Sequence, residues 1–319
     1  MLNLKTKNIA IFGDLILDQY TFGTIERISP EAPVPILDVK KSELKLGGAG
    51  NVLLNLVDLG MTCTVFGRIG NDKNGSYIKH RLDELKVQHE LLISENNCPT
   101  ITKTRVIAGN QQILRMDEET IQSISDKQEN NIIEKLKNNI RKLDTIVLSD
   151  YGKGFLTENL CQSIINEARK SNVPVIIDPK GNDFSKYKNG TVITPNYKEA
   201  QITHPTIKNI EELADKIIVQ TSLDFLLITR SQDGISYFIK DNDKITHNNF
   251  PVEVQEVTDV TGAGDTVVAI TAMCLANRID HNLLCELCNI AGAYVVGHFG
   301  ATTISSKILT NLYEDKCNE

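Results

Sequence analysis

The chain alternates short apolar runs, rich in β-branched residues, with longer amphipathic stretches. Such runs are typical of buried strands, and the stretches between them are typical of helices that connect parallel strands. The apolar runs lie at residues 9–13, 62–67, 145–150, 173–179, 191–196 and 225–230. This pattern predicts an α/β fold in which a mainly parallel central sheet is covered on both faces by helices.

Two of the intervening stretches show helical spacing most clearly. Their apolar residues fall on one helical face, because they recur at intervals of three and four. They are Val52, Leu53, Leu56 and Val57 in the stretch 50–60, and Ile132, Ile133, Leu136 and Ile140 in the stretch 127–143. Both stretches are therefore predicted to be crossover helices.

Two segments depart from this alternation. Residues 18–39 alternate like strands but carry three prolines, which are tolerated at sheet edges and not in a central parallel strand. Residues 99–117 read as two strands joined by a turn at 108–110. Together these segments predict a small β-layer, or lid, that covers a ligand. We expect one domain over residues 1–319 with the lid strands inserted in it.

Composition narrows the choice of partners. The 34 Lys and Arg residues against 41 Asp and Glu residues give a net charge of −7, which disfavours binding to nucleic acid or to an anionic membrane. No apolar stretch reaches the roughly 18 residues of a membrane span, and the N-terminus lacks a signal-peptide pattern. We therefore expect a cytoplasmic protein whose partners are small molecules.

The seven cysteines do not form a disulfide framework, because their number is odd and they are scattered. Cys285 and Cys288 form a Cys-x-x-Cys pair inside an apolar, helical stretch. A second Cys or His pair that would complete a zinc site does not stand near them. We expect reduced, buried thiols.

The strongest chemical motif is Asp-Val-Thr-Gly-Ala-Gly-Asp-Thr at residues 259–266, followed by a helical run. Gly262 and Gly264 let the backbone approach an anion, and the start of a helix offers unpaired N–H groups and a favourable dipole. Gly262, Ala263 and Gly264 therefore predict a phosphate cradle. Asp265 either complements the helix dipole or acts as a base at the same anion site. A purely structural helix cap is the alternative.

Other glycine and polar positions also follow predicted strands. Gly47 and Gly48 precede a helix and would admit a ligand close to the backbone, and Asn51 can donate and accept hydrogen bonds. Asp14 and Asp18 follow the first strand, at the sheet edge where ligands bind. The alternatives are a tight strand-to-helix turn and solvated turn carboxylates. The spacing of a dinucleotide-binding Gly-x-Gly-x-x-Gly is absent.

Asn196 and Glu199 are a third candidate pair, at the end of the strand predicted at 191–196. An amide and a carboxylate three residues apart share one helical face and can orient water molecules on Mg²⁺ around nucleotide phosphates. An ordinary N-cap with a glutamate in the first turn predicts the same two residues. Both interpretations stay open.

The motif at 258–265 resembles the C-terminal signature of the PfkB (ribokinase-like) sugar kinases, and residues 47–51 resemble their second signature. This resemblance implies a ribokinase-like three-layer sandwich with a β-strand lid, and ATP and Mg²⁺ as cofactors. It implies that Asp265 is the catalytic base, that the cradle at 262–264 holds the transferring phosphoryl group, and that Asp14, Asp18, Gly47, Gly48 and Asn51 contact the sugar. On the nucleotide side it implies roles for Asn196, Glu199, Thr229, Arg230, Gly234, Thr258 and Asn289.

Longer blocks resemble the heptose 7-phosphate kinases that form one half of bifunctional heptose kinase/adenylyltransferases. These blocks are residues 27–35, 99–106, 110–112, 148–154 and 177–181. The resemblance implies phosphorylation of the C1 hydroxyl of D-glycero-β-D-manno-heptose 7-phosphate, in the synthesis of ADP-heptose for lipopolysaccharide. Lys103, Arg105 and Arg115, on alternating lid positions, would bind the 7-phosphate. Solvated charges that protect a sheet edge are the alternative.

Two further expectations follow from the resemblance. Members of the family often pair through the lid, so we expect a homodimer. The adenylyltransferase motif does not occur in the chain, so we expect a stand-alone kinase. Three alternatives stay open: a kinase for another sugar or sugar phosphate, a non-catalytic sugar-sensing protein, and a nucleotide-binding scaffold without turnover.

Overall fold

The computed structural model describes residues 4–93, 98–241, 244–252, 257–298 and 300–318. Its main sheet is parallel from β5 to β11, and β12 and β13 extend it as an antiparallel pair. Across the sheet the order is β13 (Lys244–Phe250), β12 (Ile235–Asp241), β11 (Phe225–Thr229), β10 (Val192–Ile193), β9 (Val175–Asp178), β8 (Thr145–Ser149), β1 (Asn8–Gly13), β4 (Thr62–Ile69) and β5 (Gln88–Ile93).

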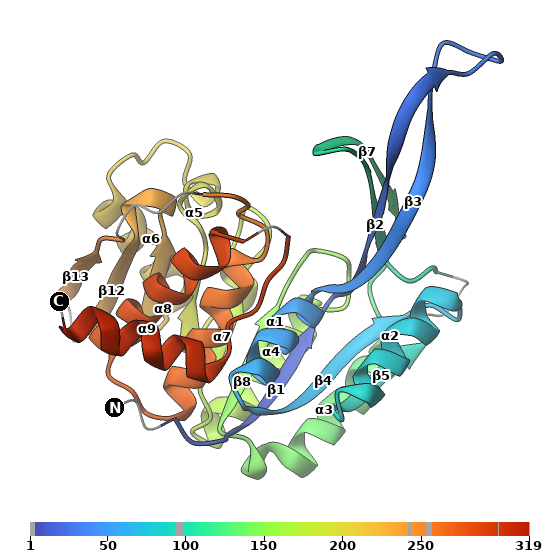
Figure 1. Cartoon of the computed structure of the whole chain (residues 1–319). Helices are drawn as coiled ribbons and strands as arrows, with labels where there is room; N and C mark the ends of the chain where they lie inside the picture. The colour runs from blue at the N-terminus through green and yellow to red at the C-terminus, as the bar shows by residue number, and fades with distance from the viewer. Residues whose placement is uncertain (1–3, 94–97, 242–243, 253–256, 299, 319) are drawn as a thin grey trace.

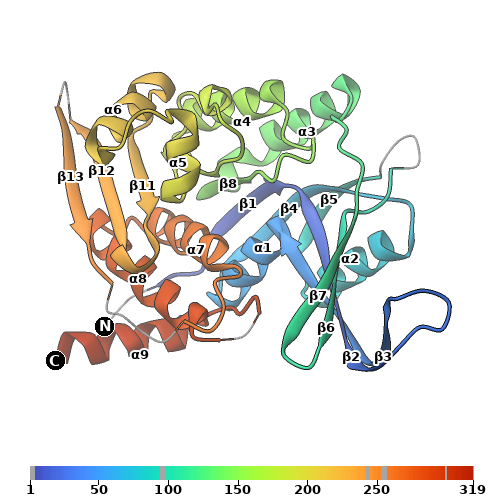
Figure 2. The ribbon, with the colours of Figure 1, turned by 90° about the horizontal axis from the view of Figure 1, so that it is seen from above.

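Helices cover both faces of this sheet, as Figure 2 shows from above. One face carries α1 (Ala49–Asp58), α2 (Lys73–Glu84), α7 (Ala263–Ala276), α8 (His281–Val296) and α9 (Ser306–Asn318). The other carries α3 (Asp126–Asn139), α4 (Glu158–Lys170), α5 (Tyr197–Thr203) and α6 (Ile210–Thr221). The predicted three-layer α/β sandwich is confirmed. Within the described ranges, every helix is too short or too polar to span a bilayer.

The central strands are apolar throughout because both of their faces are buried. On β1, Ile9 and Ile11 pack against the helices of one face, whereas Ala10 and Phe12 pack against those of the other. The six predicted strands correspond to β1, β4, β8, β9, β10 and β11, and the two predicted helices correspond to α1 and α3. The prediction missed β5, β12 and β13, which lie toward the sheet margins, where a strand need not be continuously apolar.

The predicted β-layer is a separate sheet in the order β3-β2-β6-β7. It consists of β2 (Leu15–Ile28), β3 (Pro35–Gly48), β6 (Thr102–Ala108) and β7 (Gln111–Glu118). The β2–β3 hairpin extends far from the body of the molecule (Figure 1). Both of its strands run beyond the predicted range 18–39, so the lid reaches directly into the body.

The lid is joined to the main sheet at two adjacent points. The chain leaves β1 through Asp14 to begin β2, and it returns from β3 through Gly48 into α1. The Ala49 N–H donates to the Asp14 carbonyl oxygen at 3.1 Å. Gly48 has φ +57°, and a Cβ there would lie 2.5 Å from that same oxygen, so this crossing requires glycine. The base of the lid therefore has a fixed position relative to the start of α1.

The predicted state of the Cys-x-x-Cys pair is confirmed. Cys285 and Cys288 are free and fully buried in α8. Cys288 Sγ lies 3.6 Å from Thr271 Oγ1, and burial raises the pKa of the Cys288 thiol to about 12. Both thiols are core side chains and stay protonated at neutral pH.

Candidate active site

The start of α7 carries the motif that the sequence singled out. Gly262 is the N-cap residue, with φ 82° and ψ 0°, and the helix begins at Ala263. A Cβ on Gly262 would lie 2.7 Å from Asn51 Nδ2, whereas a Cβ on Gly264 would meet no atom within 4 Å. The first N–H groups of a helix have no acceptor within the helix. The helix start therefore presents an accessible backbone surface suited to an anion.

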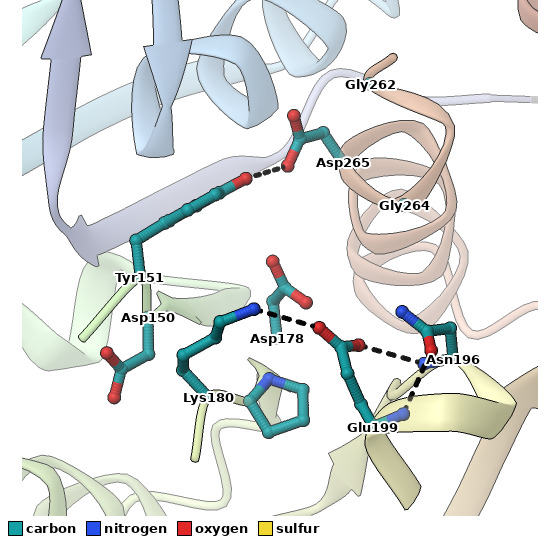
Figure 3. A pocket seen from close by; sticks show the side chains of 10 residues that line it. Asp150, Tyr151, Asp178, Lys180, Asn196, Glu199, Gly262, Gly264 and Asp265 are labelled. Carbon is teal, nitrogen blue, oxygen red and sulfur yellow. Dashed lines mark hydrogen bonds and ion pairs between the residues drawn. The ribbon is translucent and has the colours of Figure 1, made fainter. Parts of the chain in front are cut away.

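Asp265, in the first turn of α7, is buried with 8% of its surface exposed. Asn51 Nδ2 donates to its Oδ2 at 2.6 Å. The Tyr151 hydroxyl donates to its Oδ1, also at 2.6 Å (Figure 3). Burial raises the pKa of Asp265 to about 6, and the two hydrogen bonds partly oppose this shift. A carboxylate with a pKa near the working pH is suited to general base catalysis.

Asp14 is buried, and its carboxylate is bound by backbone N–H groups of the protein. Its two oxygens accept backbone N–H bonds from Tyr151 at 3.0 Å, Lys153 at 3.1 Å and Phe155 at 3.2 Å. Burial raises the pKa of Asp14, and these hydrogen bonds oppose the rise. In this arrangement Asp14 fixes the loop after β8. Its predicted contact with a sugar stays a prediction.

Asp18, on β2, acts electrostatically on Asp265. Its carboxylate pairs with Arg105 on β6, and its negative charge adds to burial in raising the pKa of Asp265. Arg105 also lies over the Tyr20 ring, 5.2 Å from its centroid. A Cβ on Gly47 would lie 2.2 Å from Asp18 Oδ2, so glycine makes room for this carboxylate. The lid and α7 thus bring Asp18 and Asp265 to the same site.

The other predicted lid cations differ in their surroundings. Arg115 is held by Asp117 through two hydrogen bonds, of 2.8 and 3.0 Å. Lys103 is half-buried, and burial followed by the charge of Lys153 lowers the pKa of its ammonium group. Lys153, which was not among the predicted site residues, pairs with Glu119 at 2.6 Å. Lys103 and Lys153 are therefore neighbouring cations at the base of the lid.

A cavity of about 170 Å³ opens beside Asp265. Its lining residues are Asp150, Tyr151, Asp178, Pro179, Lys180, Asn196, Glu199, Gly262, Gly264 and Asp265 (Figure 3). Lys180 carries the one positive side chain among these residues, and its Nζ lies 3.2 Å from Glu199 Oε1. Tyr151, Asp178 and Lys180 were not among the predicted site residues. Their blocks matched the family resemblance, but no local motif indicated their roles.

Asn196 and Glu199 form a capping box at the start of α5. Asn196 Oδ1 accepts from the Glu199 N–H at 3.0 Å, and Glu199 Oε2 accepts from the Asn196 N–H at 3.1 Å. The structure thus contains the N-cap that was one of the two interpretations. Because both residues also line the cavity beside Asp265, their predicted role at a metal stays a prediction.

A second cavity of about 400 Å³ adjoins the first, and Asn196 and Gly264 line both. Its wall is mostly apolar. Besides Asn196, three predicted nucleotide-side residues line it: Thr229, Gly234 and Asn289. The remaining lining residues, besides Gly264, are Ser231, Gln232, Ile235, Val252, Val257, Val260, Ala263, Val267, Cys288, Gly292, Ala293 and Val296. A flat, apolar group with a polar tail fits such a site.

Arg230 and Thr258 do not line this cavity. The Arg230 guanidinium donates to the Asp233 carbonyl oxygen at 3.0 Å and to Asn249 Oδ1, so it holds its own loop. The Thr258 N–H donates to the Val296 carbonyl oxygen at 2.8 Å. Their predicted contacts with a nucleotide stay predictions.

The model of the pfkB family carbohydrate kinases matches residues 6–308. The chain belongs to this family. It is 44% identical over 314 residues to the "Bifunctional protein HldE" of Aliarcobacter butzleri, covering 97% of this chain and 64% of that protein. It is 40% identical over 318 residues to the protein of the same name from Campylobacter curvus, covering 98% and 66%. The chain spans less than two thirds of the length of these relatives.

Solved structures support the fold of this kinase. Phosphofructokinase-2 from Escherichia coli, in complex with potassium, matches with a TM-score of 0.77 at 16% identity, covering 98% of this chain and 99% of that one. Ribokinase from Arabidopsis thaliana, complexed with ribose and ATP, matches with a TM-score of 0.73 at 19% identity, covering 97% and 99%. The predicted ribokinase-like fold is confirmed, and the chain is an ATP-dependent carbohydrate kinase.

Replacing the Asp265 carboxylate in this kinase should change stability in a pH-dependent way. The pKa of Asp265 is higher in the folded than in the unfolded state, so proton binding by this carboxyl favours folding. This contribution to folding stability is complete below about pH 4 and is lost as the pH rises through 6. In urea titrations, the free energy of unfolding of Asp265→Asn, taken relative to that of the wild type, should rise by roughly 2–3 kcal/mol from pH 4 to pH 8.

Asp117→Asn is the control, because the stability that this carboxylate contributes changes with pH in the opposite direction. Arg115 lowers the pKa of the exposed Asp117, so this carboxylate stabilises the fold above its unfolded pKa and loses that effect as the pH falls through the folded value. A difference between Asp265→Asn and wild type that does not vary with pH would show that Asp265 has an ordinary pKa.

Proposed function

We propose that this kinase phosphorylates the C1 hydroxyl of D-glycero-β-D-manno-heptose 7-phosphate, giving heptose 1,7-bisphosphate for ADP-heptose and lipopolysaccharide core synthesis in the cytoplasm. The observation that carries the proposal is the position of Asp265, a buried carboxylate at a glycine-flanked helix start that faces a lid with basic residues. Similarity to HldE proteins over nearly the whole chain supports the substrate.

In the reaction, Asp265 accepts the proton of the C1 hydroxyl as that oxygen attacks the γ-phosphorus of ATP. The bond between this phosphorus and the β,γ-bridging oxygen breaks, and ADP leaves with the electron pair. The Gly262 and Gly264 N–H groups would stabilise the charge on the transferring phosphoryl oxygens, whereas the Ala263 N–H donates to the Val260 carbonyl oxygen at 3.3 Å. Lys180 supplies a positive side chain in the same cavity.

ATP would lie with its phosphates toward the cavity beside Asp265 and its adenine in the adjoining apolar cavity, against Asn289, Ala293 and Val296. Asn196 and Glu199 would hold Mg²⁺ through water, because their oxygen donors suit a hard cation and both line the cavity beside Asp265. When bound, Mg²⁺ would neutralise charge on the phosphates.

The lid cations support a sugar that carries its own phosphate. Arg105 and Arg115 already pair with Asp18 and Asp117. Lys103 is half-buried beside a second cation, Lys153, which lowers its pKa. A dianionic phosphate bound between the two ammonium groups would relieve this repulsion and form charge-assisted hydrogen bonds. Lys153 itself pairs with Glu119, as the two arginines pair with Asp18 and Asp117, so Lys103 is the first proposed ligand of the 7-phosphate and Lys153 is its neighbouring cation.

Asp265→Asn should lower kcat by about 10²- to 10⁴-fold while the KM for ATP changes little, because the side-chain shape survives and the proton acceptor is lost. Sugar-dependent release of ADP measures this, with heptose 7-phosphate compared against other sugars and sugar phosphates. A near-wild-type kcat in the variant would remove Asp265 as the base. A preference for a different sugar would overturn the substrate.

Lys103→Ala and Lys153→Ala should each raise the KM for the sugar phosphate by about tenfold or more, while the KM for ATP stays near wild type. Lys170→Ala is the matched control, since this lysine is exposed on α4 and pairs with Glu167. If both variants behave like the control, the 7-phosphate binds elsewhere.

We further propose a homodimer formed through the lid. All of β7 is exposed, including Ile113, Leu114 and Met116, and Val34 and Val39 are exposed on the hairpin. Such an edge is normally covered in solution. Sedimentation of the wild-type protein should give a species of about twice the chain mass of 35.5 kDa. The Leu114→Lys variant should sediment with the mass of a single chain. A wild-type protein that sediments as one chain at micromolar concentration contradicts the dimer.

A further inference from the structure

We propose that Tyr151 is a positioning residue that holds the carboxylate of Asp265 in place and keeps it ionised. Its hydroxyl donates to Asp265 Oδ1 at 2.6 Å, as Figure 3 shows. Tyr151 comes from the loop after β8, and Asp265 comes from α7, so two separate layers of the fold meet at this bond. The inference rests on the proposed function of Asp265 as the base.

The loop that carries Tyr151 is fixed from several sides. Asp14 accepts the Tyr151 N–H at 3.0 Å and the N–H groups of Lys153 and Phe155. Arg68, on β4, donates to the Lys153 carbonyl oxygen at 2.9 Å. A buried carboxylate and a guanidinium thus fix the backbone on both sides of Gly152. The tyrosine hydroxyl is therefore positioned before a substrate arrives.

The two hydrogen bonds on Asp265 have complementary effects. Tyr151 occupies one lone pair of Oδ1 and Asn51 occupies one of Oδ2, so the plane of the carboxylate is fixed. Each oxygen keeps a further lone pair that can accept the proton of a sugar hydroxyl. Asn51 therefore also acts on Asp265 in this structure, in addition to its predicted contact with the sugar.

The charges around Asp265 explain why a donor is needed there. The negative charge of Asp18, on the lid, adds to burial in raising the pKa of Asp265. Burial, and then the charge of Asp265, raises the pKa of Asp178 in the same cavity. Asp150, Glu199 and Lys180 line the same cavity. In this mainly acidic surrounding, removal of a hydrogen bond to the ionised form would favour the protonated carboxyl, which cannot accept a proton.

The Tyr151 hydroxyl keeps the proton that it donates to Asp265. Burial, and then the negative charge of Asp265, raises the pKa of the Tyr151 hydroxyl well above its ordinary value. The hydroxyl therefore keeps its proton over the pH range in which the enzyme works. It acts on the sugar only through Asp265.

Tyr151→Phe tests the inference, because it removes only the hydroxyl group. The pKa of Asp265 should rise by roughly one unit, since a hydrogen bond to a charged group is lost. The acidic limb of the kcat/KM profile should move to higher pH by the same amount, and kcat should fall about tenfold. The pKa is measured by NMR titration of ¹³C-labelled aspartate carboxyl groups, with Asp265→Asn used to assign the resonance.

Tyr237→Phe is the matched control, because it also removes a hydroxyl that has a side-chain partner, His281, away from Asp265. A second change, Tyr151→3-fluorotyrosine, keeps the ring and makes the hydroxyl a stronger donor, so the pKa of Asp265 should fall. This variant tests the inference even if Tyr151→Phe does not fold.

The inference is overturned if the Asp265 pKa stays at its wild-type value in both Tyr151 variants, or if Tyr237→Phe shifts it equally. The NMR titration needs no substrate. If the wild-type protein phosphorylates no sugar phosphate, the proposed function fails, whereas a shifted pKa in Tyr151→Phe would still support the contact.

Discussion

The burial of one carboxylate, Asp265, at the start of α7 is the constraint on which the site depends. A buried charge is costly unless donors are supplied. The donors come from residues 214 and 114 positions away in the chain, Asn51 and Tyr151. Both bonds exist only when α1, α7 and the loop after β8 are packed together. The geometry of the Asp265 carboxylate is therefore a property of the assembled sandwich.

The same packing brings the lid close to Asp265. β2 leaves the main sheet at Asp14, which also fixes the loop of Tyr151, and β3 returns at Gly48, three residues before Asn51. Each donor to Asp265 thus lies close to one of the two crossings between body and lid.

Much of the fold could be predicted because continuous apolar runs require burial on both faces, as in β1 and β8. Strands near the margins, such as β5, escaped prediction because they lack such runs. Two glycines at a helix start indicated an anion site beside Asp265, and only the resemblance to the PfkB kinases favoured a base over a structural cap. Tyr151, Lys153 and Lys180 were not predicted, since their partners are distant in sequence. Asp14 and Arg230 were predicted as ligand contacts, but in the structure their side chains hold loops of the protein.

We propose that the buried Asp265 carboxylate deprotonates the anomeric hydroxyl of a sugar that already carries a phosphate. Phosphorus NMR of a reaction with ATP and heptose 7-phosphate tests it most directly. We expect a second sugar phosphorus, coupled to the anomeric proton, whose signal grows in step with ADP. Release of ADP with only inorganic phosphate, or a new phosphate on another carbon, would contradict it.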